Sequence, residues 1–516
     1  MEFDVARSVT EAWKVWIAGG AILLLGIWPL LRDRRARSAL LLALTLFSCW
    51  NHARWGTRSV TERVDTYDLV HYYLNAKYFE ELGYYDLYPS IILADHENDG
   101  PWFKNAGNTY MAQDAEGHAL KPVSHALARG RHVKAEAFTP ERWAAFTHDA
   151  LHLQRAYKRE WSDKLWRQMV MDHGFNGTTA WTLVAEPLTR VVPVEYIKWL
   201  CHLDLLLLIG MAGLITWAYG VDTALWLVLF LTASYSLRWP TVSWVFLRYD
   251  WVFALVGAMA FIKKGHPLIG GILAGWAATL RFFPAMWMWG PFAKGVAGLT
   301  RRHVSRPLLV LAAGFVLGVA VIQGAATARY GVESVSVHFE NMLDHNRPEQ
   351  LSSRRIGLGL GMTFDGGLTP KLLTKERKLV IKNQQPLRYG LSLLFLLVMG
   401  WGLRRSSDDE AYGFGFLPFF LLTTASYYYY VARATLAVLH AADLDRLRNR
   451  VGLTLLFTME LFSNWAEGAH PGHRSYLIGW LAWMLAAYAL IMCVWVLVDA
   501  RRADSTDAPA DGAAAA

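Results

Sequence analysis

Hydrophobic residues fall in long blocks along most of this chain, and charged residues are rare inside the blocks. A membrane-spanning helix needs roughly 20 consecutive apolar residues, because the hydrocarbon core of a bilayer is about 30 Å thick. The alternating pattern of outer-membrane barrel strands does not occur in the sequence. The blocks therefore predict thirteen spanning helices, at residues 13–31, 38–52, 196–219, 222–237, 250–262, 267–280, 284–298, 307–327, 387–403, 411–429, 431–442, 450–465 and 475–499.

Two stretches between the predicted spans are too long to be simple connections. Residues 53–195 and 328–386 are rich in both charged and aromatic residues, which favours folded segments over flexible spacers. This pattern divides the chain into six segments. They are two N-terminal helices (1–52), a large loop (53–195), a first group of helices (196–327), a second loop (328–386), a C-terminal group of helices (387–499) and a disordered tail (500–516).

The composition narrows the class of protein further. Of the 516 residues, 54% are hydrophobic and only 18% are charged. These are too few polar residues to cover the surface of a water-soluble globular protein. We therefore expect an all-α polytopic membrane protein with folded external loops, similar in architecture to the family named below. The net charge of +8 is explained by arginines that contact anionic membrane lipids, so no nucleic-acid partner is expected.

Basic residues in the short loops predict the orientation. Arg34 and Arg35 follow the first predicted span, Lys263 follows the fifth, and Arg302 follows the seventh. Under strict alternation these loops all lie on one side, which the positive-inside rule assigns to the cytosol. The N-terminus and both long loops are then external, and the C-terminal tail is cytosolic.

The first long loop opens with a pattern that is typical of an amphipathic helix. Apolar and aromatic residues recur at spacings of three and four from Leu69 to Gly83, which predicts a helix that ends at Gly83 and lies in the membrane interface. Asp65 and Asp68 fall in its first turn, with His71 one turn after Asp68. Two interpretations stay open: Asp68 is a general base for a hydroxyl, or both acids only cap the helix. A second helix is predicted at 139–171.

The order of residues in this helix resembles a known family. Asp68 is followed by Tyr72 and Tyr73, then by Gly83 and a Leu-Tyr pair at 87–88. This order is similar to the first external loop of GT-C glycosyltransferases, above all their bacterial branch of polyprenyl-phosphate-sugar-dependent mannosyl- and arabinofuranosyltransferases. A small-residue helix that ends in Arg281 and Pro284 is similar to a segment of the same group, and the tyrosines at 427–430 are a third, weaker likeness.

The resemblance implies a function and a location. It implies transfer of a hexose or pentose from a polyprenyl-phosphate sugar donor to a hydroxyl of a glycan or lipid acceptor, with inversion, at the external face of a bacterial inner membrane. Such a reaction would belong to polysaccharide biosynthesis in the cell envelope. Asp68 and Asp65 are the candidate catalytic acids. The candidate substrate-binding residues are His71, Tyr72, Tyr73, Arg281, His345, Arg347, Arg354, Arg355, Tyr430 and Arg433.

Charges near predicted external span ends support this reading independently, because charges at a membrane edge are costly unless they are paired or functional. They are Arg238, Arg248, Asp250, Arg281, Arg433 and Arg474. A guanidinium group can meet two phosphate oxygens at once, which suits a lipid-phosphate donor. The alternative for each arginine is snorkelling or a salt bridge, for example between Arg248 and Asp250.

The second long loop adds candidates for binding a diphosphate or a sugar. His345, Arg347, Arg354 and Arg355 occur within eleven residues, although such basic clusters are often solvated surfaces. The glycines at 357–361 have the wrong spacing for a dinucleotide site and predict a close-packed loop instead.

No cofactor is expected. The acids at 65–68 and at 95–99 are the only pairs that suggest a divalent cation, and neither completes a known calcium loop. Two other functions stay open as alternatives: a flippase or transporter for lipid-linked sugars, which should show internal repeats and midplane charges, and a non-catalytic membrane scaffold.

Overall fold

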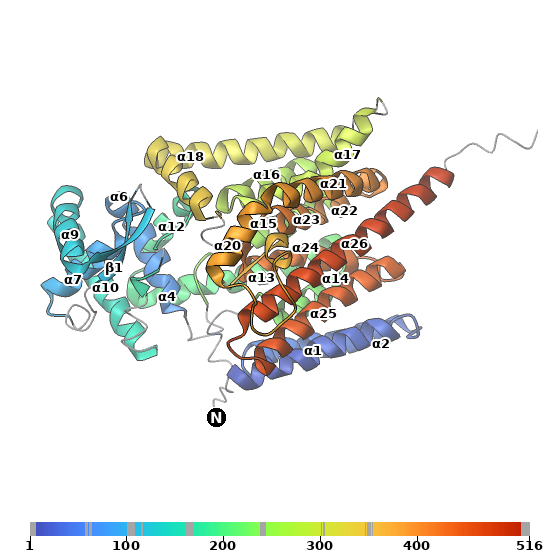
Figure 1. Cartoon of the computed structure of the whole chain (residues 1–516), viewed down its shortest axis with the longest axis horizontal. Coiled ribbons are helices and arrows are strands. Elements are labelled where there is room, and N and C mark those ends of the chain that lie inside the picture. Colours follow the sequence, from blue (N-terminus) through green and yellow to red (C-terminus); the bar gives the residue numbers. More distant parts are fainter. Residues whose placement is uncertain are drawn as a thin grey trace, which may run out of the picture.

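The structure is a computed structural model of the whole chain. It describes residues 7–56, 60, 64–100, 109–114, 117–160, 169–172, 174–237, 244–300, 302, 305–345, 347, 352 and 354–506. In these residues the chain forms a bundle of long helices with a smaller, mainly helical cap at one end (Figure 1). Helix α26 extends from the bundle at the end opposite the cap.

The bundle is built from the apolar blocks of the sequence. Its helices are α1 (Arg7–Ile27), α2 (Arg34–His52), α13 (Ile197–Tyr219), α14 (Val221–Ala233), α15 (Asp250–Lys263), α16 (Pro267–Leu280), α17 (Trp289–Thr300), α18 (Arg306–His345), α21 (Gln385–Gly402), α22 (Asp408–Gly413), α23 (Phe416–Leu422), α24 (Ala434–Ala441), α25 (Leu447–Ala469) and α26 (Arg474–Thr506). Within the described part of the chain, five helical segments are long and apolar enough to cross a membrane: Ser8–Ile27, Val194–Tyr219, Arg306–Leu343, Gln385–Arg405 and Arg474–Ser505. The protein is a helical membrane protein.

Several predicted spans differ from the helices. The block at 411–429 is divided between α22 and α23, and it then continues into strand β4 (Ala425–Ser426) and the 3-10 helix η6 (Tyr427–Arg433). A Cβ atom on Gly415, between α22 and α23, would lie 2.2 Å from the Cα of Trp287, so the chain there is held against a neighbouring backbone. The expectation of one continuous helix at 411–429 is therefore wrong, and the total of thirteen spans stays a prediction. Helix α18 continues well past the predicted end at residue 327.

Helices α16 and α18 are packed backbone to backbone. A Cβ atom on Gly271 would lie 2.2 Å from the carbonyl oxygen of Leu311, and one on Gly275 would lie 2.5 Å from that of Phe315. Small residues allow such close approach, which is a common source of helix association within a membrane. This packing fixes the end of α16, where Arg281 directly follows.

Helix α18 bends sharply at Gly331. Its backbone angles there, φ 83° and ψ 159°, lie outside the helical region and are accessible at low cost only to glycine. The last part of α18, residues 332–345, therefore turns away from the long part of the helix and comes down beside the cap (Figure 1).

The cap is formed by the first long loop. It contains α4 (Thr66–Leu69), a π-helical turn η1 (Val70–Leu74), α5 (Asn75–Lys77), α6 (Phe79–Leu82), α7 (Leu87–Glu97), an antiparallel hairpin of β1 (Thr109–Asp114) and β2 (Gly117–Pro122), α9 (Val123–Ala137), α10 (Pro140–Glu160) and α12 (Thr179–Val191), followed by the 3-10 turn η2 (Val194–Tyr196). Aromatic rings form its core, with Tyr78, Phe138 and Phe146 in mutual contact.

The second long loop contributes short elements beside the cap. They are strand β3 (Arg355–Ile356), α19 (Leu358–Gly361) and α20 (Thr374–Asn383), and the 3-10 turn η5 (Leu403–Arg405) follows α21. Strands β3 and β4 are antiparallel, with Arg355 opposite Ser426.

The amphipathic segment of the sequence is helical, but it is placed differently from the prediction. It ends at Gly83 as expected, and it contains a π-helical turn and a break at Tyr78. Its apolar face, including Leu69, Tyr73 and Phe79, is buried inside the cap and not exposed to a membrane surface. This apolar face is therefore not available to a membrane surface, because it packs against the cap and α18, and a position of the segment at the membrane interface stays a prediction. Helix α10 starts directly after Thr139, as expected, and part of its predicted continuation to 171 lies outside the described residues.

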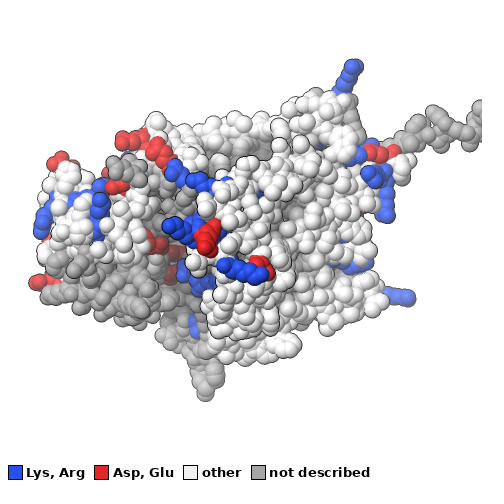
Figure 2. Space-filling view, in the orientation of Figure 1, with Lys and Arg blue, Asp and Glu red and all other residues white. Residues whose placement is uncertain are grey.

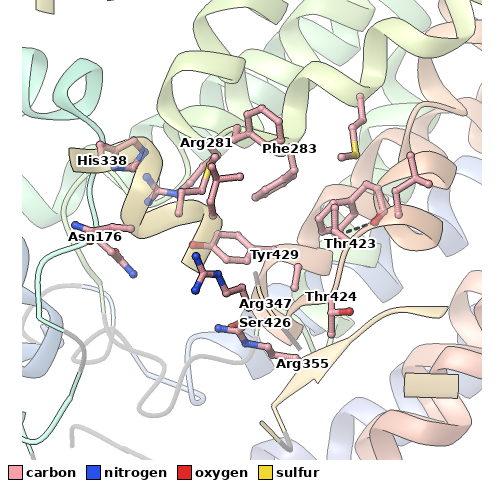
Figure 3. Close-up of a pocket in the computed structure, with 18 of the residues that line it drawn as sticks. Asn176, Arg281, Phe283, His338, Arg347, Arg355, Thr423, Thr424, Ser426 and Tyr429 are labelled. Atoms are coloured by element: carbon pink, nitrogen blue, oxygen red, sulfur yellow. Dashed lines mark hydrogen bonds between the residues drawn. The ribbon is translucent and has the colours of Figure 1, made fainter. Parts of the chain in front are cut away.

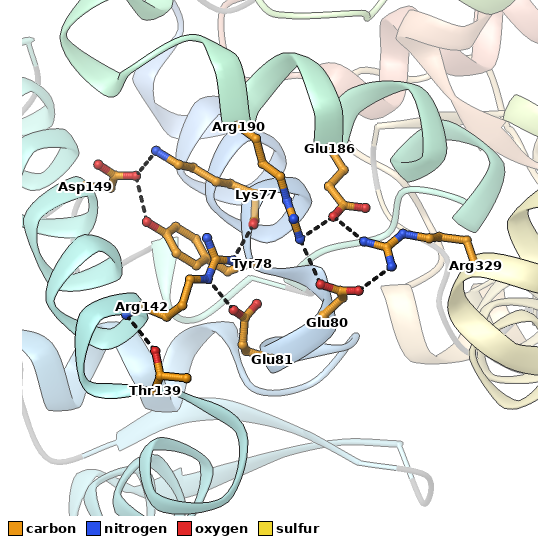
Figure 4. Close-up of polar contacts among 10 residues, drawn as sticks. All are labelled: Lys77, Tyr78, Glu80, Glu81, Thr139, Arg142, Asp149, Glu186, Arg190 and Arg329. Carbon is orange, nitrogen blue, oxygen red and sulfur yellow. Dashed lines mark hydrogen bonds and ion pairs between the residues drawn. The ribbon is translucent and has the colours of Figure 1, made fainter.

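Ion pairs hold the cap together (Figure 4). The ammonium group of Lys77 lies 2.6 Å from Asp149, which also accepts a hydrogen bond of 3.0 Å from Tyr78. Arg142 pairs with Glu81 and donates to the carbonyl oxygen of Lys77. These contacts join α10 to the segment that begins with Asp68.

A second set of ion pairs attaches the cap to α18 (Figure 4). The guanidinium group of Arg329 lies 2.7 Å from Glu80 and 3.0 Å from Glu186. Arg190 also pairs with both acids. Because Arg329 lies just before the bend at Gly331, these contacts fix the point from which the end of α18 turns toward the cap.

On the face drawn in Figure 2, few charged side chains lie on the flank of the bundle. Figure 2 shows Lys, Arg, Asp and Glu on the cap, beside it, and at the opposite end of the bundle, with a largely uncharged surface between. This distribution is the one expected for a bundle that is surrounded by lipid at mid-height.

Candidate functional site

Two adjoining cavities lie where the cap meets the bundle. The larger has a volume of about 320 Å³ and is lined by the cap, the end of α18, the start of α21 and the strand pair β3–β4. The smaller has a volume of about 60 Å³ and is lined by Asp68. Arg281 and Tyr429 line both, so the two spaces are neighbouring parts of one site. We call the larger the arginine cavity, after Arg281, Arg347, Arg355 and Arg388, and the smaller the aspartate cavity.

Asp68 reaches the aspartate cavity because of how its helix begins. The side chain of Asp65 accepts a hydrogen bond of 3.4 Å from the backbone N–H of Asp68, so Asp65 is the N-cap of α4. Asp65 is buried and lines neither cavity. The capping interpretation therefore applies to Asp65, whose side chain caps the helix. Asp68 points into the site, where the interpretation as a general base applies. A catalytic role for Asp65 is not supported by this placement.

Asp68 forms an ion pair with Arg248, and both side chains are mostly buried. The partner that the sequence suggested for Arg248 was Asp250, and the structure shows Asp68 in its place. Buried ion pairs keep a carboxylate ionised, because removing either charge leaves the other unbalanced in a poorly solvated site.

A strained loop positions Arg248. Leu247, directly before it, has a φ of 52°, which is unusual for a branched residue. The backbone N–H groups of Arg248 and Tyr249 donate to the carboxylate of Asp204 at 2.8 and 3.2 Å. Asp204 belongs to α13. Helix α13 of the bundle therefore fixes the loop that carries Arg248, the ion-pair partner of Asp68. No sequence signal linked these residues.

Tyr72 lies one turn after Asp68 and also lines the aspartate cavity. Its hydroxyl donates a hydrogen bond of 2.7 Å to the side-chain oxygen of Asn176. Burial raises the pKa of Tyr72 to about 12, with the nearby Arg281 acting in the opposite direction. The phenol is therefore protonated at neutral pH and acts as a donor. Tyr72 lies within the π-helical turn over residues 70–74, and such turns are frequent at functional sites.

Arg281 connects the two cavities. It ends α16 in an extended conformation and is followed by Pro284 at the start of the 3-10 helix η3 (Phe283–Met288). One of its terminal nitrogens donates to the carbonyl oxygen of Leu280 at 2.8 Å. Its Nε is buried and has no hydrogen-bond partner among the described residues. The turn therefore presents a guanidinium group with unused donors to the site.

Arg347, Arg355 and Arg388 complete the arginine cavity. Figure 3 shows Arg281, Arg347 and Arg355 reaching toward the same space around Tyr429, with Asn176 and His338 facing them from other elements. The described residues that line this cavity include no Asp or Glu. The cavity is therefore strongly positive, which suits an anionic ligand.

Arg388 was not expected from the sequence. It lies in the first turn of α21, within an apolar block that predicted only a span. Its guanidinium packs against the backbone of Gly359, where a Cβ atom would lie 2.6 Å from Nη1. Gly357 likewise lies against the carbonyl oxygen of Thr423, so the glycines of this loop are close-packed as predicted. An arginine inside an apolar block was the available signal.

Two residues predicted to bind substrate lie behind the site. The ring nitrogens of His71 contact the carbonyl oxygen of Tyr67 at 2.8 Å and the hydroxyl of Tyr88 at 2.7 Å. Burial lowers the pKa of His71, so the ring is neutral at physiological pH. Tyr73 is fully buried and donates to the carbonyl oxygen of Val192. Both side chains are used in packing the cap, and neither lines a cavity.

Tyr430 and Arg433 are buried inside the bundle and line neither cavity, although each contacts a residue that does. The side chain of Arg433 is fully buried, lies 2.7 Å from Glu460 and donates to Ser236. Tyr430 packs against Phe419. The charge of Arg433 is balanced by a buried acid and its side chain lines neither cavity, so this placement does not support a role in binding phosphate.

The remaining predicted residues are accounted for as follows. Arg354 is exposed and lines neither cavity, although Arg355 beside it does. The side chain of His345 and all of Arg238 lie outside the described residues. In the second acidic cluster, Asp95 accepts from Gln154 and Glu97 pairs with Lys134.

Breaking the buried pair should reveal its structural role. Replacing Arg433 with Met leaves Glu460 buried without a counter-charge, which should lower the free energy of unfolding by about 3–5 kcal/mol. The double variant R433M/E460Q removes both charges and keeps an oxygen that accepts from the N–H of Tyr235, so it should recover most of that loss. Thermal unfolding in detergent measures both. Equal destabilisation of the single and double variants would show that packing matters and charge does not.

The fold and the site together define a helical membrane protein with a capped, positively charged cavity beside a buried carboxylate. No protein-family model, no curated protein and no solved structure matches the chain. The resemblance to GT-C glycosyltransferases therefore depends on the residues quoted for it.

Proposed function

We propose that the protein is a membrane glycosyltransferase that moves a sugar from a polyprenyl-phosphate-linked donor to an acceptor hydroxyl. The observation that carries this proposal is the position of Arg281, which lines the cavity of Asp68 and the arginine cavity alike. A group transfer of this kind needs a base beside the acceptor and cations beside the leaving phosphate. The two cavities provide these at adjoining positions.

The chemistry follows from this arrangement. The donor phosphate lies against the arginines, and the sugar extends toward Asp68. As the acceptor oxygen attacks the anomeric carbon, its proton passes to Asp68 and the bond between that carbon and the phosphate oxygen breaks. The lipid phosphate leaves with the bonding electrons on the opposite face, so the configuration inverts. The arginines stabilise the negative charge that develops on the leaving oxygen.

The ion pair with Arg248 is compatible with this role. A carboxylate has two oxygens and about four acceptor sites, so Asp68 can contact Arg248 and an acceptor hydroxyl together. Arg248 keeps the carboxylate ionised, which a base requires before the reaction.

The proposed setting is the inner membrane of a bacterium, with the cap outside. Figure 2 shows Lys and Arg side chains, with some Asp and Glu, at the end of the bundle opposite the cap, and basic groups are expected on a cytosolic side. The acceptor is then a glycan or lipid of the cell envelope. A transporter for lipid-linked sugars would use charges along a path through the bundle. Arg433 and Glu460 are charged groups inside the bundle, but they pair with each other and line neither cavity.

The test is an assay of sugar release. Purified protein is reconstituted with radiolabelled lipid-linked sugars extracted from the membranes of a deletion strain, where the donor should accumulate. Transfer predicts loss of the label from the lipid fraction and its appearance in a new glycoside. Movement of the intact lipid-linked sugar between leaflets, without cleavage, would overturn the proposal in favour of a transporter.

A further inference from the structure

A rigid turn carries Asn176 into the arginine cavity. The turn lies directly before α12, and buried tyrosines of the cap hold two of its glycines. Gly174 has a φ of 66°, and its backbone N–H donates a hydrogen bond of 3.1 Å to the hydroxyl of Tyr88. The carbonyl oxygen of Gly177 accepts one of 3.1 Å from Tyr84. The backbone therefore sets the position of Asn176, while its side chain lines the cavity (Figure 3).

Tyr72 fixes the orientation of the Asn176 amide. The hydroxyl of Tyr72 donates a hydrogen bond of 2.7 Å to Oδ1 of Asn176. A side-chain amide has an acceptor oxygen and an NH₂ group with two donor hydrogens. Because the bond from Tyr72 engages the oxygen, the NH₂ group is the part of the amide that can donate to a ligand. Asn176 therefore offers N–H donors to the cavity that it lines.

This hydrogen bond joins the two cavities. Tyr72 lines the aspartate cavity together with Asp68, whereas Asn176 lines the arginine cavity. Arg281 lines both and interacts electrostatically with Tyr72. The amide thus lies at the boundary between the proposed phosphate site and the proposed base. Any group that connects the phosphate to Asp68 must pass this boundary, and in the proposed reaction that group is the sugar.

A second polar side chain lies near the same boundary. His338 belongs to the last part of α18, after the bend at Gly331, and lines the arginine cavity. The centroid of its ring lies 5.9 Å from that of Tyr84, and it interacts electrostatically with Arg281. Amide and imidazole groups both form hydrogen bonds with hydroxyls. Tyr84 and Phe175 add aromatic surface to this wall. A few placed polar groups on an apolar wall suit a sugar ring, which has hydroxyls on its edge and C–H groups on its faces.

We propose that Asn176, held by Tyr72, hydrogen-bonds a ring hydroxyl of the donor sugar and so selects which sugar the protein accepts. The proposal rests on the proposed function for the presence of a sugar between phosphate and base, and binding of that sugar does not require its transfer. A site that hydrogen-bonds a substrate hydroxyl rejects analogues in which the hydroxyl is missing or misplaced, because its polar groups are then left unpaired. Asn176 is thus a binding residue, and no bond is made or broken at its side chain.

Binding of lipid-linked sugars that differ only in the sugar tests the proposal. The full chain, purified in detergent, is titrated with the farnesyl phosphate esters of mannose, glucose, galactose and arabinofuranose. Farnesyl methyl phosphate, which has the same single charge and no sugar, is the reference ligand. We expect the esters to differ in affinity, and the preferred ester to bind about fivefold or more tightly than the reference, the value of one uncharged hydrogen bond.

Replacing Asn176 should remove this preference. Asn176→Ala should weaken the preferred ester by about fivefold and the reference ligand by less than about twofold, because the phosphate contacts stay in place. Asn176→Ser has a shorter side chain, should act similarly, and replaces the alanine variant if that variant does not fold. Asn98→Ala is the matched control, since Asn98 is an exposed amide of the cap that lines neither cavity, and it should change neither affinity.

A double-mutant cycle tests the part of Tyr72. Tyr72→Phe removes the hydroxyl that orients the amide and keeps the ring, so it should weaken the preferred ester by about threefold. The double variant Y72F/N176A should bind that ester no more weakly than N176A alone, because the hydroxyl acts through the amide. Additive losses would overturn the assignment of Tyr72 to orienting Asn176.

Three results would overturn the proposal as a whole. They are equal affinity for the reference and all four glycosyl esters, equal weakening of the reference and the preferred ester by Asn176→Ala, and unchanged binding of every ester in that variant. A sugar preference that Asn176→Ala abolishes, together with no sugar release in the reconstituted assay, would uphold the sugar site and reject the transferase.

Discussion

Replacing Asp68 with Asn should lower the rate of sugar transfer by about 1,000-fold, which lies within the range for removal of a general base. Asn has nearly the same shape but cannot accept the proton of the acceptor hydroxyl. Initial rates in the reconstituted assay, at saturating donor, measure this loss. Donor affinity should change little, because the arginine cavity is left intact.

Asp65→Asn is the matched control for this prediction. Asp65 is an N-cap that lines neither cavity, and Asn caps helices about as well as Asp, so activity should stay within about twofold of wild type. Asp68→Glu keeps the charge but moves it by one methylene, and it should give an intermediate rate. Full activity of Asp68→Asn combined with loss in Asp65→Asn would reassign the base to Asp65.

The ion pair with Arg248 adds a second readout. Asp68→Asn removes the ion pair with Arg248, which still interacts with Asp65, so thermal stability is measured on the same preparation. Arg248→Gln removes the same ion pair and leaves the base present. If loss of activity came only from a weakened fold, the two variants would lose activity in proportion to their loss of stability.

Replacing Arg281 with Gln should lower kcat/KM for the donor by about 100-fold, the value of two charge-assisted hydrogen bonds of roughly 1.5 kcal/mol each. Arg281 lines both cavities, and its Nε has no hydrogen-bond partner in the described structure. Arg281→Lys keeps a positive charge but loses the planar fork, so it should recover only part of the loss. Initial rates over a range of donor concentrations separate kcat from KM.

Arg354→Gln serves as the control for Arg281. Both residues were candidate phosphate ligands by sequence, and only Arg281 lines the site. Arg354 is exposed and its replacement should leave kcat/KM unchanged. Similar losses in the two variants would indicate that the charge of the whole surface attracts the donor and that the cavity does not select it.

The two variants should also affect different kinetic constants. Asp68→Asn is expected to lower kcat with little change in KM, because a base acts in the transition state. Arg281→Gln is expected to raise KM and also lower kcat, because a phosphate ligand contacts both the bound donor and the leaving group.

Local features of the chain could be read from the sequence. Helices were placed from the apolar blocks, because a membrane helix must satisfy its own backbone hydrogen bonds and cover itself with apolar side chains. The end of a helix at Gly83 and the start of another after Thr139 were likewise predictable, since capping depends on residues a few positions apart. Asp68 and Arg281 were both singled out, one from a helix start and the other from a helix end.

The partners of these charged residues were decided by the tertiary structure. Arg248 pairs with Asp68 across 180 positions through a loop that Asp204 holds, and Arg433 pairs with Glu460 and not with a ligand. Arg388 lines the cavity from α21, and its guanidinium lies against Gly359 of a distant loop. Charges pair with whatever the folded chain brings within a few ångströms, and sequence spacing carries no record of that distance. The sequence by itself determined the membrane class and the helix positions, whereas only the tertiary structure decided which charges face one another and which face a cavity.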